Sequence, residues 1–264
     1  MNLDEYIFDL AYLLLKPNIG QKHIKELIIS KGKIARCPNS FIDDLEKGGI
    51  KVLPFWDKKY PPFLKEIPDY PVFLFLKGDI SLLEKNFVTI VGSRKISNYS
   101  FEVLERFFEK RKDFPKNICF VSGLANGVDS EVHRLCLKKN LATIGVVGGG
   151  LDRVYYRGNS VMYQYLCKYR LVISEFPPGR KFFKGMFPLR NRILAGMSKK
   201  TIIIQAGKRS GALNTATHAN NYGRDVFVVP NSILCEGSQG CLELISQGAN
   251  VVKNIDGFVE FLSE

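Results

Sequence analysis

A glycine, a serine and an arginine stand together at Gly92, Ser93 and Arg94, directly after the apolar run FVTIV at 87–91. At the carboxyl end of a buried strand, a glycine lets the backbone approach a ligand closely, and a hydroxyl donates a hydrogen bond to it. A guanidinium can donate two parallel hydrogen bonds to one phosphate. The chemistry that this turn suggests is phosphate binding. The plainer alternative is a surface arginine beside an ordinary strand end, because such a tripeptide occurs by chance in many sequences.

Further turns rich in glycine and serine follow the later apolar runs. They are SGLANGVD at 122–129, GGGLDRVYYRGN at 148–159 and SGALNTA at 210–216. Such turns present backbone amides, which bind anions when several of them meet at one edge of a sheet. We expect phosphate donors at Ser210 and Gly211, and supporting turns at Ser122, Gly123, Gly127, Gly148 and Gly150.

The loop EFPPGRKFFKGMFPLRNR at 175–192 interleaves cations with aromatic rings. Single-stranded DNA uses both, because the charges follow the backbone while an exposed ring stacks an unpaired base for about 1–3 kcal/mol. The bases of a duplex are already stacked and cannot use such a ring. Burial in the core is the ordinary alternative for Phe182, Phe183 and Phe187, and we expect one of the three, Phe187, to stack a base.

The positive charge of the chain is concentrated in one stretch. The whole sequence has a net charge of +12, which a lysine-rich proteome could also produce. Residues 176–224, however, hold ten basic side chains and no acidic one. A focused positive field of this kind steers a phosphate backbone toward the protein, so the distribution favours a polyanionic partner.

Short apolar runs alternate with amphipathic stretches from residue 87 onward. The runs are FVTIV (87–91), NICFV (117–121), ATIGVV (142–147), LVIS (171–174), TIIIQ (201–205) and DVFVV (225–229). Helical patterns at 99–112, 127–139, 159–169, 188–197 and 211–222 separate them. This alternation predicts an α/β fold with a doubly wound, mainly parallel sheet, and the continuous apolar character of the runs indicates that helices cover both faces.

The segment before the first run has a different pattern. Leu3, Ile7, Leu10 and Leu14 form an apolar stripe with helical spacing, so we expect a small helical module at 1–57 and a sheet-containing, DNA-binding domain at 58–264. The prolines between 61 and 71 suit a connector on the surface of that domain better than a central strand.

Composition argues against several other classes of protein. No apolar run is long enough to cross a bilayer, and acidic residues stand near the N-terminus where a secretory signal would carry basic ones, so we expect a soluble, cytoplasmic protein. The six cysteines show no CxxC spacing and the three histidines lie far apart in the sequence. We therefore expect reduced cysteines, no metal site and no cofactor.

Seven motifs follow one another in an order and spacing that resemble the DNA-processing protein A (DprA) family of natural transformation. They are YPPFLKEIPDYPVFLFLKGD (60–79), TIVGSR (89–94), VSGLANGVDSEVH (121–133), ISEFPPG (173–179), FPLRNRILAGMS (187–198), SGALNTATHA (210–219) and GSQGCLELISQGA (237–249). The resemblance covers about residues 56–255. It implies an extended Rossmann-like fold, a basic pocket for single-stranded DNA, a homodimer, and delivery of the strand to the RecA recombinase.

The resemblance also implies which residues form the pocket. Its phosphate contacts would come from Gly92, Ser93, Arg94, Lys184, Arg190, Asn191, Arg192, Ser210 and Gly211, and Phe187 would stack a base. The chain departs from the family's pattern at Tyr155-Tyr156, where tyrosine-proline is usual, and at Ala212, where serine is usual. We expect no counterpart of the C-terminal winged helix that many members have, while PNIGQKHIKELI at 17–28 resembles a helix-hairpin-helix or SAM-like module.

The sequence thus predicts a non-catalytic mediator that binds single-stranded DNA, protects incoming strands and loads RecA onto them. The alternative is a nucleotide-binding Rossmann-like enzyme or sensor related to the nucleoside-monophosphate phosphoribohydrolases. Neither their PGGxGTxxE segment nor a Walker GxxxxGK[ST] motif occurs in the chain. Asp129 and Glu175 are the carboxylates that an enzyme could use, and helix capping and loop fixing are their structural alternatives.

Overall fold

The computed structural model describes residues 3–153 and 159–262, so Tyr155 and Tyr156 lie outside the described residues. The strands are β1 (Lys51–Pro54), β2 (Phe73–Gly78), β3 (Asn86–Gly92), β4 (Ile118–Ser122), β5 (Ala142–Val146), β6 (Leu171–Ser174), β7 (Lys200–Gln205), β8 (Asp225–Val228) and β9 (Asn250–Val251). The α-helices are α1 (Ile7–Leu13), α2 (Gln21–Ile29), α3 (Asn39–Lys47), α4 (Pro62–Glu66), α5 (Asn98–Glu109), α6 (Val128–Lys138), α7 (Ser160–Tyr169), α8 (Met186–Met197), α9 (Gly211–Asn221), α10 (Gln239–Ser246) and α11 (Ile255–Glu260). Short 3-10 turns occupy Leu3–Tyr6, Ile80–Glu84, Arg111–Asp113 and Glu236–Ser238.

Within the described residues, the strands form one sheet in the order β1-β2-β6-β5-β4-β3-β7-β8-β9. All neighbours from β6 to β9 pair in parallel, and each of the six predicted runs forms one of the strands β3 to β8. The five predicted helices are α5 to α9. The prediction of a doubly wound, mainly parallel α/β fold is therefore confirmed.

Two strands at one edge were not predicted. β1 pairs antiparallel with β2, and β2 pairs antiparallel with β6. β1 lies inside the segment 1–57 that was expected to be helical, and it is only four residues long and ends on Pro54. A short edge strand that ends in proline carries little sequence signal, because it makes few ladder bonds and has no regular alternation.

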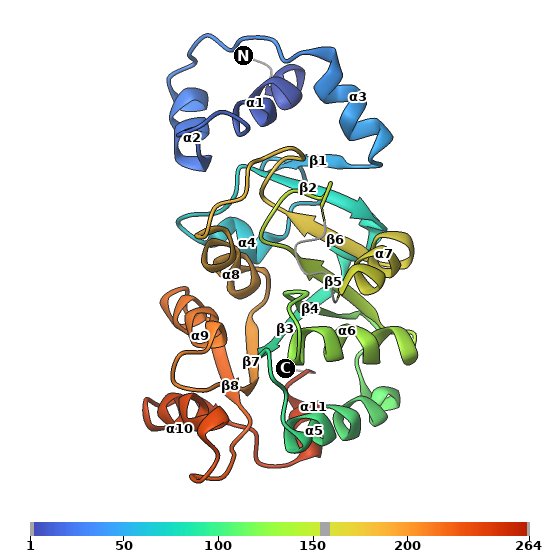
Figure 1. The fold of residues 1–264 in the computed structure, drawn as a ribbon, viewed down its shortest axis with the longest axis vertical. Helices are drawn as coiled ribbons and strands as arrows, with labels where there is room; N and C mark the ends of the chain where they lie inside the picture. Colours follow the sequence, from blue (N-terminus) through green and yellow to red (C-terminus); the bar gives the residue numbers. More distant parts are fainter. Residues whose placement is uncertain (1–2, 154–158, 263–264) are drawn as a thin grey trace.

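Helices cover both faces of the sheet. On one face, α8, α9 and α10 pack against strand residues such as Val91, Val121 and Ile203. On the other face, α5, α6 and α11 pack against the alternate residues, such as Ile90 and Ile202. Figure 1 shows these two groups of helices on either side of the strands. Burial on both faces explains why the strands are apolar throughout.

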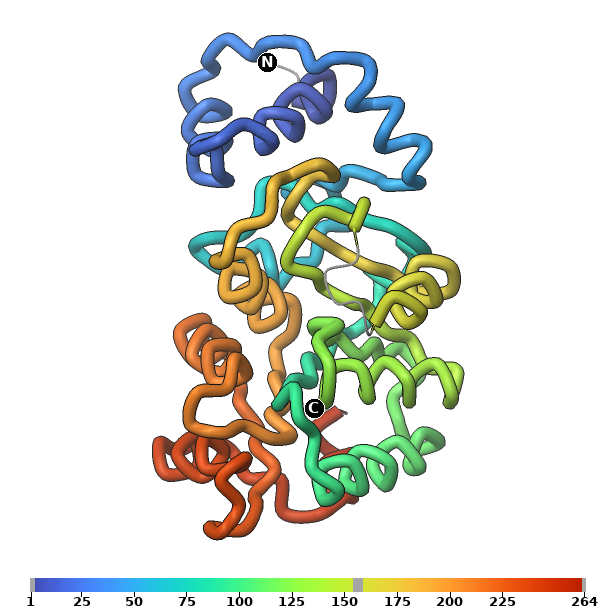
Figure 2. Tube along the Cα trace, in the orientation of Figure 1, coloured from blue at the N-terminus to red at the C-terminus, as the bar shows by residue number. Residues whose placement is uncertain are grey.

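The N-terminal helices, blue in Figure 2, sit at one end of the long axis, and α10, in orange-red, lies near the opposite end. Gln21 of α2 accepts a hydrogen bond from the Val72 amide at 2.9 Å and donates one to the Glu175 carbonyl at 3.2 Å. Arg180 donates to the carbonyls of Leu14 and Lys16. The N-terminal helices are thus bonded to the loop that precedes α8. Across residues 3–153 and 159–262, no helix has the length and apolar character needed to span a bilayer.

Candidate nucleic-acid interface

The sheet has its switch point between β3 and β7. From β3 the chain adds β4, β5 and β6 on one side, then returns through α8 to place β7 on the other side of β3. A cleft of about 540 Å³ opens there, lined by residues 91–95 at the end of β3 and by Gly207 and residues 209–212 after β7. Open α/β sheets bind ligands in this position because the two adjacent loops diverge and expose backbone amides.

The turn after β3 is held by the beginning of α6. The amide of Val128 donates to the Ser93 carbonyl at 3.1 Å. Gly127 has a φ of +80°, and a Cβ there would lie 2.3 Å from the Ser93 oxygen, while a Cβ on Gly92 would lie 2.6 Å from the Val128 side chain. Both positions therefore need glycine, and the turn presents an exposed Arg94 at the rim of the cleft.

The amino end of α9 forms the next part of the rim. The Ser210 side chain caps this helix by accepting a hydrogen bond from the Ala212 amide at 3.3 Å. Gln205, at the end of β7, accepts from the Ser97 amide at 2.9 Å and donates to the Lys95 carbonyl at 3.3 Å. These bonds fasten the β3 and β7 loops together, so the α9 terminus, with its partial positive charge, faces the same space as the turn at 92–94.

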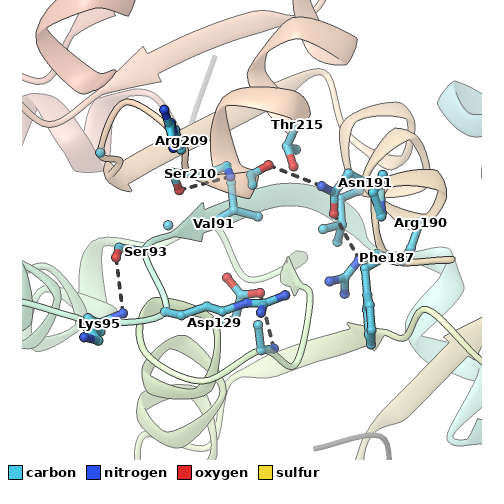
Figure 3. A pocket seen from close by; sticks show the side chains of 18 of the residues that line it. Val91, Ser93, Lys95, Asp129, Phe187, Arg190, Asn191, Arg209, Ser210 and Thr215 are labelled. Atoms are coloured by element: carbon cyan, nitrogen blue, oxygen red, sulfur yellow. Dashed lines mark hydrogen bonds between the residues drawn. The ribbon is translucent and has the colours of Figure 1, made fainter. Parts of the chain in front are cut away.

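Helix α8 supplies the opposite wall, as Figure 3 shows for Phe187, Arg190 and Asn191. Arg190 is buried and donates to the carbonyls of Gly123 and Val146, at the ends of β4 and β5. Asn191 donates to the Gly211 carbonyl at 3.2 Å. Both were predicted as phosphate contacts. Both line the cleft, and the structure also gives each of them a role in joining α8 to the surrounding loops.

Asp129 is the carboxylate at the floor of the cleft. It is buried, and its Oδ2 accepts from the Ala125 amide at 3.4 Å. Burial raises the pKa of this carboxyl above its usual range, and the positive charge of Arg190 opposes the rise. Asp129 thus helps to hold the loop after β4 beside Arg190.

Phe187 lies partly exposed on the cleft wall. A Cβ on Gly148 would lie 2.8 Å from Cδ1 of this ring, so the glycine after β5 makes room for it. The centroid of the Phe182 ring is 5.6 Å from that of Phe187. Lys184, three residues before Phe187 in the chain, is exposed and lies outside the residues that line the cleft.

The remaining predicted turns lie behind the cleft. The Ser122 hydroxyl is buried and donates to the Ile90 carbonyl at 2.7 Å, which ties β4 to β3. A Cβ on Gly123 would lie 2.5 Å from a guanidinium nitrogen of Arg190, and a Cβ on Gly150 would lie 2.6 Å from the Pro177 carbonyl oxygen. Each of these residues allows a close approach between backbone segments.

The structure does not bring Arg192 to the cleft. Its guanidinium is buried and contacts the Glu175 carboxylate at 2.5 Å and the Asp69 carboxylate at 3.3 Å. Burial raises the pKa of Glu175, and the Arg192 charge works in the opposite direction. Arg192 lines a different cavity, between the N-terminal helices and the loop before α8.

Two cations at the cleft were absent from the predicted site. They are Lys95 and Arg209, both exposed, and each directly adjoins a predicted residue or turn. Their place in the sequence could have indicated them, because a basic residue directly beside a predicted phosphate-binding turn lies close to the same phosphate. Among the described lining residues, Arg94, Lys95, Arg190 and Arg209 are basic and Asp129 alone is acidic, so the cleft is electropositive.

Comparison with known proteins shows the family of the chain. The family model for DNA recombination-mediator protein A matches residues 51–263. The chain belongs to this family. The DNA processing protein DprA of Bacillus subtilis is 38% identical over 222 residues, covering 82% of this chain and 72% of the relative. DprA of Streptococcus pneumoniae is 41% identical over 196 residues, covering 74% of this chain and 68% of the relative.

Solved structures of DprA proteins share the fold. That of Streptococcus pneumoniae DprA has a TM-score of 0.81 and 33% identity, covering 94% of this chain and 95% of that one. A Helicobacter pylori DprA structure, described for its single-stranded DNA binding mode, has a TM-score of 0.71 and 30% identity, covering 81% of this chain and 95% of that one. The recombination-mediator family thus places the chain among proteins that act on DNA.

Proposed function

We propose that this protein binds single-stranded DNA by its phosphates in the switch-point cleft, protects incoming strands in natural transformation and loads RecA onto them as a non-catalytic homodimer. The observation that carries the proposal is the shared cleft of the turn at 92–94 and the amino end of α9, which gathers Arg94, Lys95 and Arg209 around backbone donors. Backbone amides at a helix terminus and guanidinium groups are the groups that bind phosphate oxygens.

The preference for single strands rests on Phe187. Its ring is part of the cleft wall, next to the phosphate donors, and the neighbouring Phe182 is 51% exposed. An unpaired base can stack on such a ring, whereas a paired base is already stacked in its duplex. The single-stranded DNA named for the Helicobacter pylori relative supports the same choice.

The first test is fluorescence anisotropy of labelled single strands and duplexes across a salt series. We expect tighter binding of single strands, with a log–log salt slope that falls by about 0.7 for each phosphate contact removed. Arg94→Ala removes a charge-assisted contact, which predicts a loss of affinity of about 10- to 100-fold. Lys184→Ala should weaken binding in the same direction, and Lys47→Ala, at the exposed end of α3, is the matched control.

Equal affinity for duplex and single strand would contradict the proposal, and so would indifference to Arg94→Ala. Incubation with nucleoside monophosphates tests the enzymatic alternative, since release of free base would show catalysis. RecA filament growth on strands coated with a single-strand-binding protein tests the loading step. Sedimentation velocity at increasing protein concentration tests the homodimer.

A further inference from the structure

A second basic cavity lies at the amino ends of the parallel strands, whereas the switch-point cleft lies at their carboxyl ends. It has a volume of about 390 Å³, and its lining includes Ile118 and Ala142, the first residues of β4 and β5. β4 begins here and ends at Ser122, behind the switch-point cleft. β4 is about 15 Å long, so the cavities at its two ends are distinct sites.

The charge of this cavity is strongly positive. Five of its fourteen described lining residues are cations, namely Lys85, Arg111, Lys112, Lys116 and Arg170. Its acidic lining residue is Asp79, whose carboxylate accepts a hydrogen bond from the Ser81 amide at 2.9 Å. The balance of charge therefore favours an anionic ligand.

The two arginines are fixed by neutral partners. Arg170 donates to the Leu141 carbonyl at 3.0 Å and to the Asn140 side-chain oxygen at 2.9 Å. Arg111 donates to the Lys139 carbonyl at 2.8 Å. Carbonyl oxygens orient a guanidinium without neutralising it, so both positive charges stay available at defined positions.

Exposed aromatic rings adjoin these charges. Tyr169, at the end of α7, lines the cavity and is 48% exposed. The ring of Tyr165, one helical turn earlier, is also exposed, with its centroid 5.7 Å from that of Tyr169. Cations beside exposed rings are the combination that single-stranded nucleic acid uses, because phosphates pair with the charges and bases stack on the rings.

We propose that this cavity, the amino-edge site, binds a second segment of single-stranded DNA, with its five cations on the phosphates and Tyr169 stacking a base. The inference rests on the proposed function, because it assumes that the chain handles single strands. The inference adds a second contact region for DNA. A long single strand would engage both the switch-point cleft and the amino-edge site, while a short one would occupy only one of them.

The test measures binding of a long single strand of about thirty nucleotides and a short one of about six, lengths on either side of the usual site size. Lys112→Ala with Lys116→Ala removes two exposed cations, and we expect the salt slope for the long strand to fall by about 1.4. Tyr169→Ala should weaken long-strand binding about fivefold or more, and Tyr169→Phe, which keeps the ring, should not. Lys47→Ala is again the control.

Lysine footprinting gives an independent readout. With a long strand bound, an amine-reactive label should modify Lys112 and Lys116 more slowly, while Lys47 should react at its original rate. Unchanged labelling together with an unchanged salt slope would overturn the amino-edge site, as would full binding by Tyr169→Ala. The Arg94→Ala variant separates this failure from that of the proposed function, because it removes the cleft contact and leaves the amino-edge residues intact.

Discussion

Replacement of Gly127 by alanine perturbs the turn that presents Arg94. Gly127 has a φ of +80°, in the region where a side chain is strained, and an added Cβ would lie 2.3 Å from the Ser93 carbonyl oxygen. That oxygen also accepts the hydrogen bond from the Val128 amide. The methyl group must therefore displace the turn at 92–94 or break its bond to α6.

The expected loss of folding stability follows from the strained φ and from this displaced hydrogen bond. A non-glycine residue held at positive φ costs about 1–3 kcal/mol, to which the displaced hydrogen bond adds about 1 kcal/mol. For a chain of this size, each kcal/mol lowers Tm by about 2–4 °C, so Gly127→Ala should lower Tm by about 4–16 °C. DNA affinity should fall as well, because Arg94 moves with the turn.

Gly211→Ala is the matched comparison on the other side of the cleft. An added Cβ at Gly211, the first residue of α9, meets no heavy atom within 4 Å. The free energy of unfolding should therefore stay unchanged or rise by about 0.4–1 kcal/mol, because alanine lowers the conformational entropy of the unfolded chain. Affinity for single strands should still fall, because Gly211 lines the cleft and a methyl group there takes up space beside the helix amides that we expect to bind a phosphate.

Thermal unfolding and anisotropy measured on both variants separate the two effects. The reasoning about the turn is wrong if Gly127→Ala unfolds at the wild-type temperature. The assignment of phosphate binding to the α9 terminus is wrong if Gly211→Ala, folded and stable, binds single strands as tightly as the wild type.

Three further predictions concern single side chains. Phe187→Ala should weaken single-strand binding by about 1–3 kcal/mol while Phe187→Tyr retains it, and anisotropy with equal losses in both variants would exclude a stacking role. Arg192→Met leaves the Glu175 carboxylate buried without its main partner, so urea unfolding should show a loss of about 3–5 kcal/mol with an unchanged salt slope for DNA binding; a changed slope would indicate a phosphate contact. Burial lowers the pKa of His133 to about 3, so the unfolded chain binds a proton below pH 6.5 that the folded chain does not. As the pH decreases from 6.5 to 3, the free energy of unfolding should therefore fall by about 1.4 kcal/mol per pH unit because of this residue. In His133→Gln the free energy of unfolding should depend less steeply on pH, and an equal dependence in the two proteins would contradict the lowered pKa.

The sequence alone was sufficient for the βα alternation and for the loops of the switch point. The strands β3 to β8 are buried on both faces, which makes each one a continuous apolar run that is visible without tertiary information. The turns after them were visible because they need glycine, as the contacts of Gly92 and Gly127 show. Such signals are local, so the sequence carries them directly.

The antiparallel edge depended on partners that sequence could not supply. β1 has four residues, and its place in the sheet comes from pairing with β2, which in turn pairs with β6 about a hundred residues away. The order of the strands, and hence the meeting of the β3 and β7 loops at one cleft, is a long-range property of the same kind.

The separation of Arg190 from Arg192 was decided only by the tertiary structure. Both stand in one basic segment of the sequence, but residues two apart on a helix point in directions about 200° apart. Arg190 therefore lies at the cleft, and Arg192 pairs with Glu175 away from it. Residues 190–197 of α8 are buried throughout, so no polar face in the sequence shows which side meets the cleft. The sequence by itself determined that cations gather beside glycine turns, and the packing of α8 determined which of them the cleft receives.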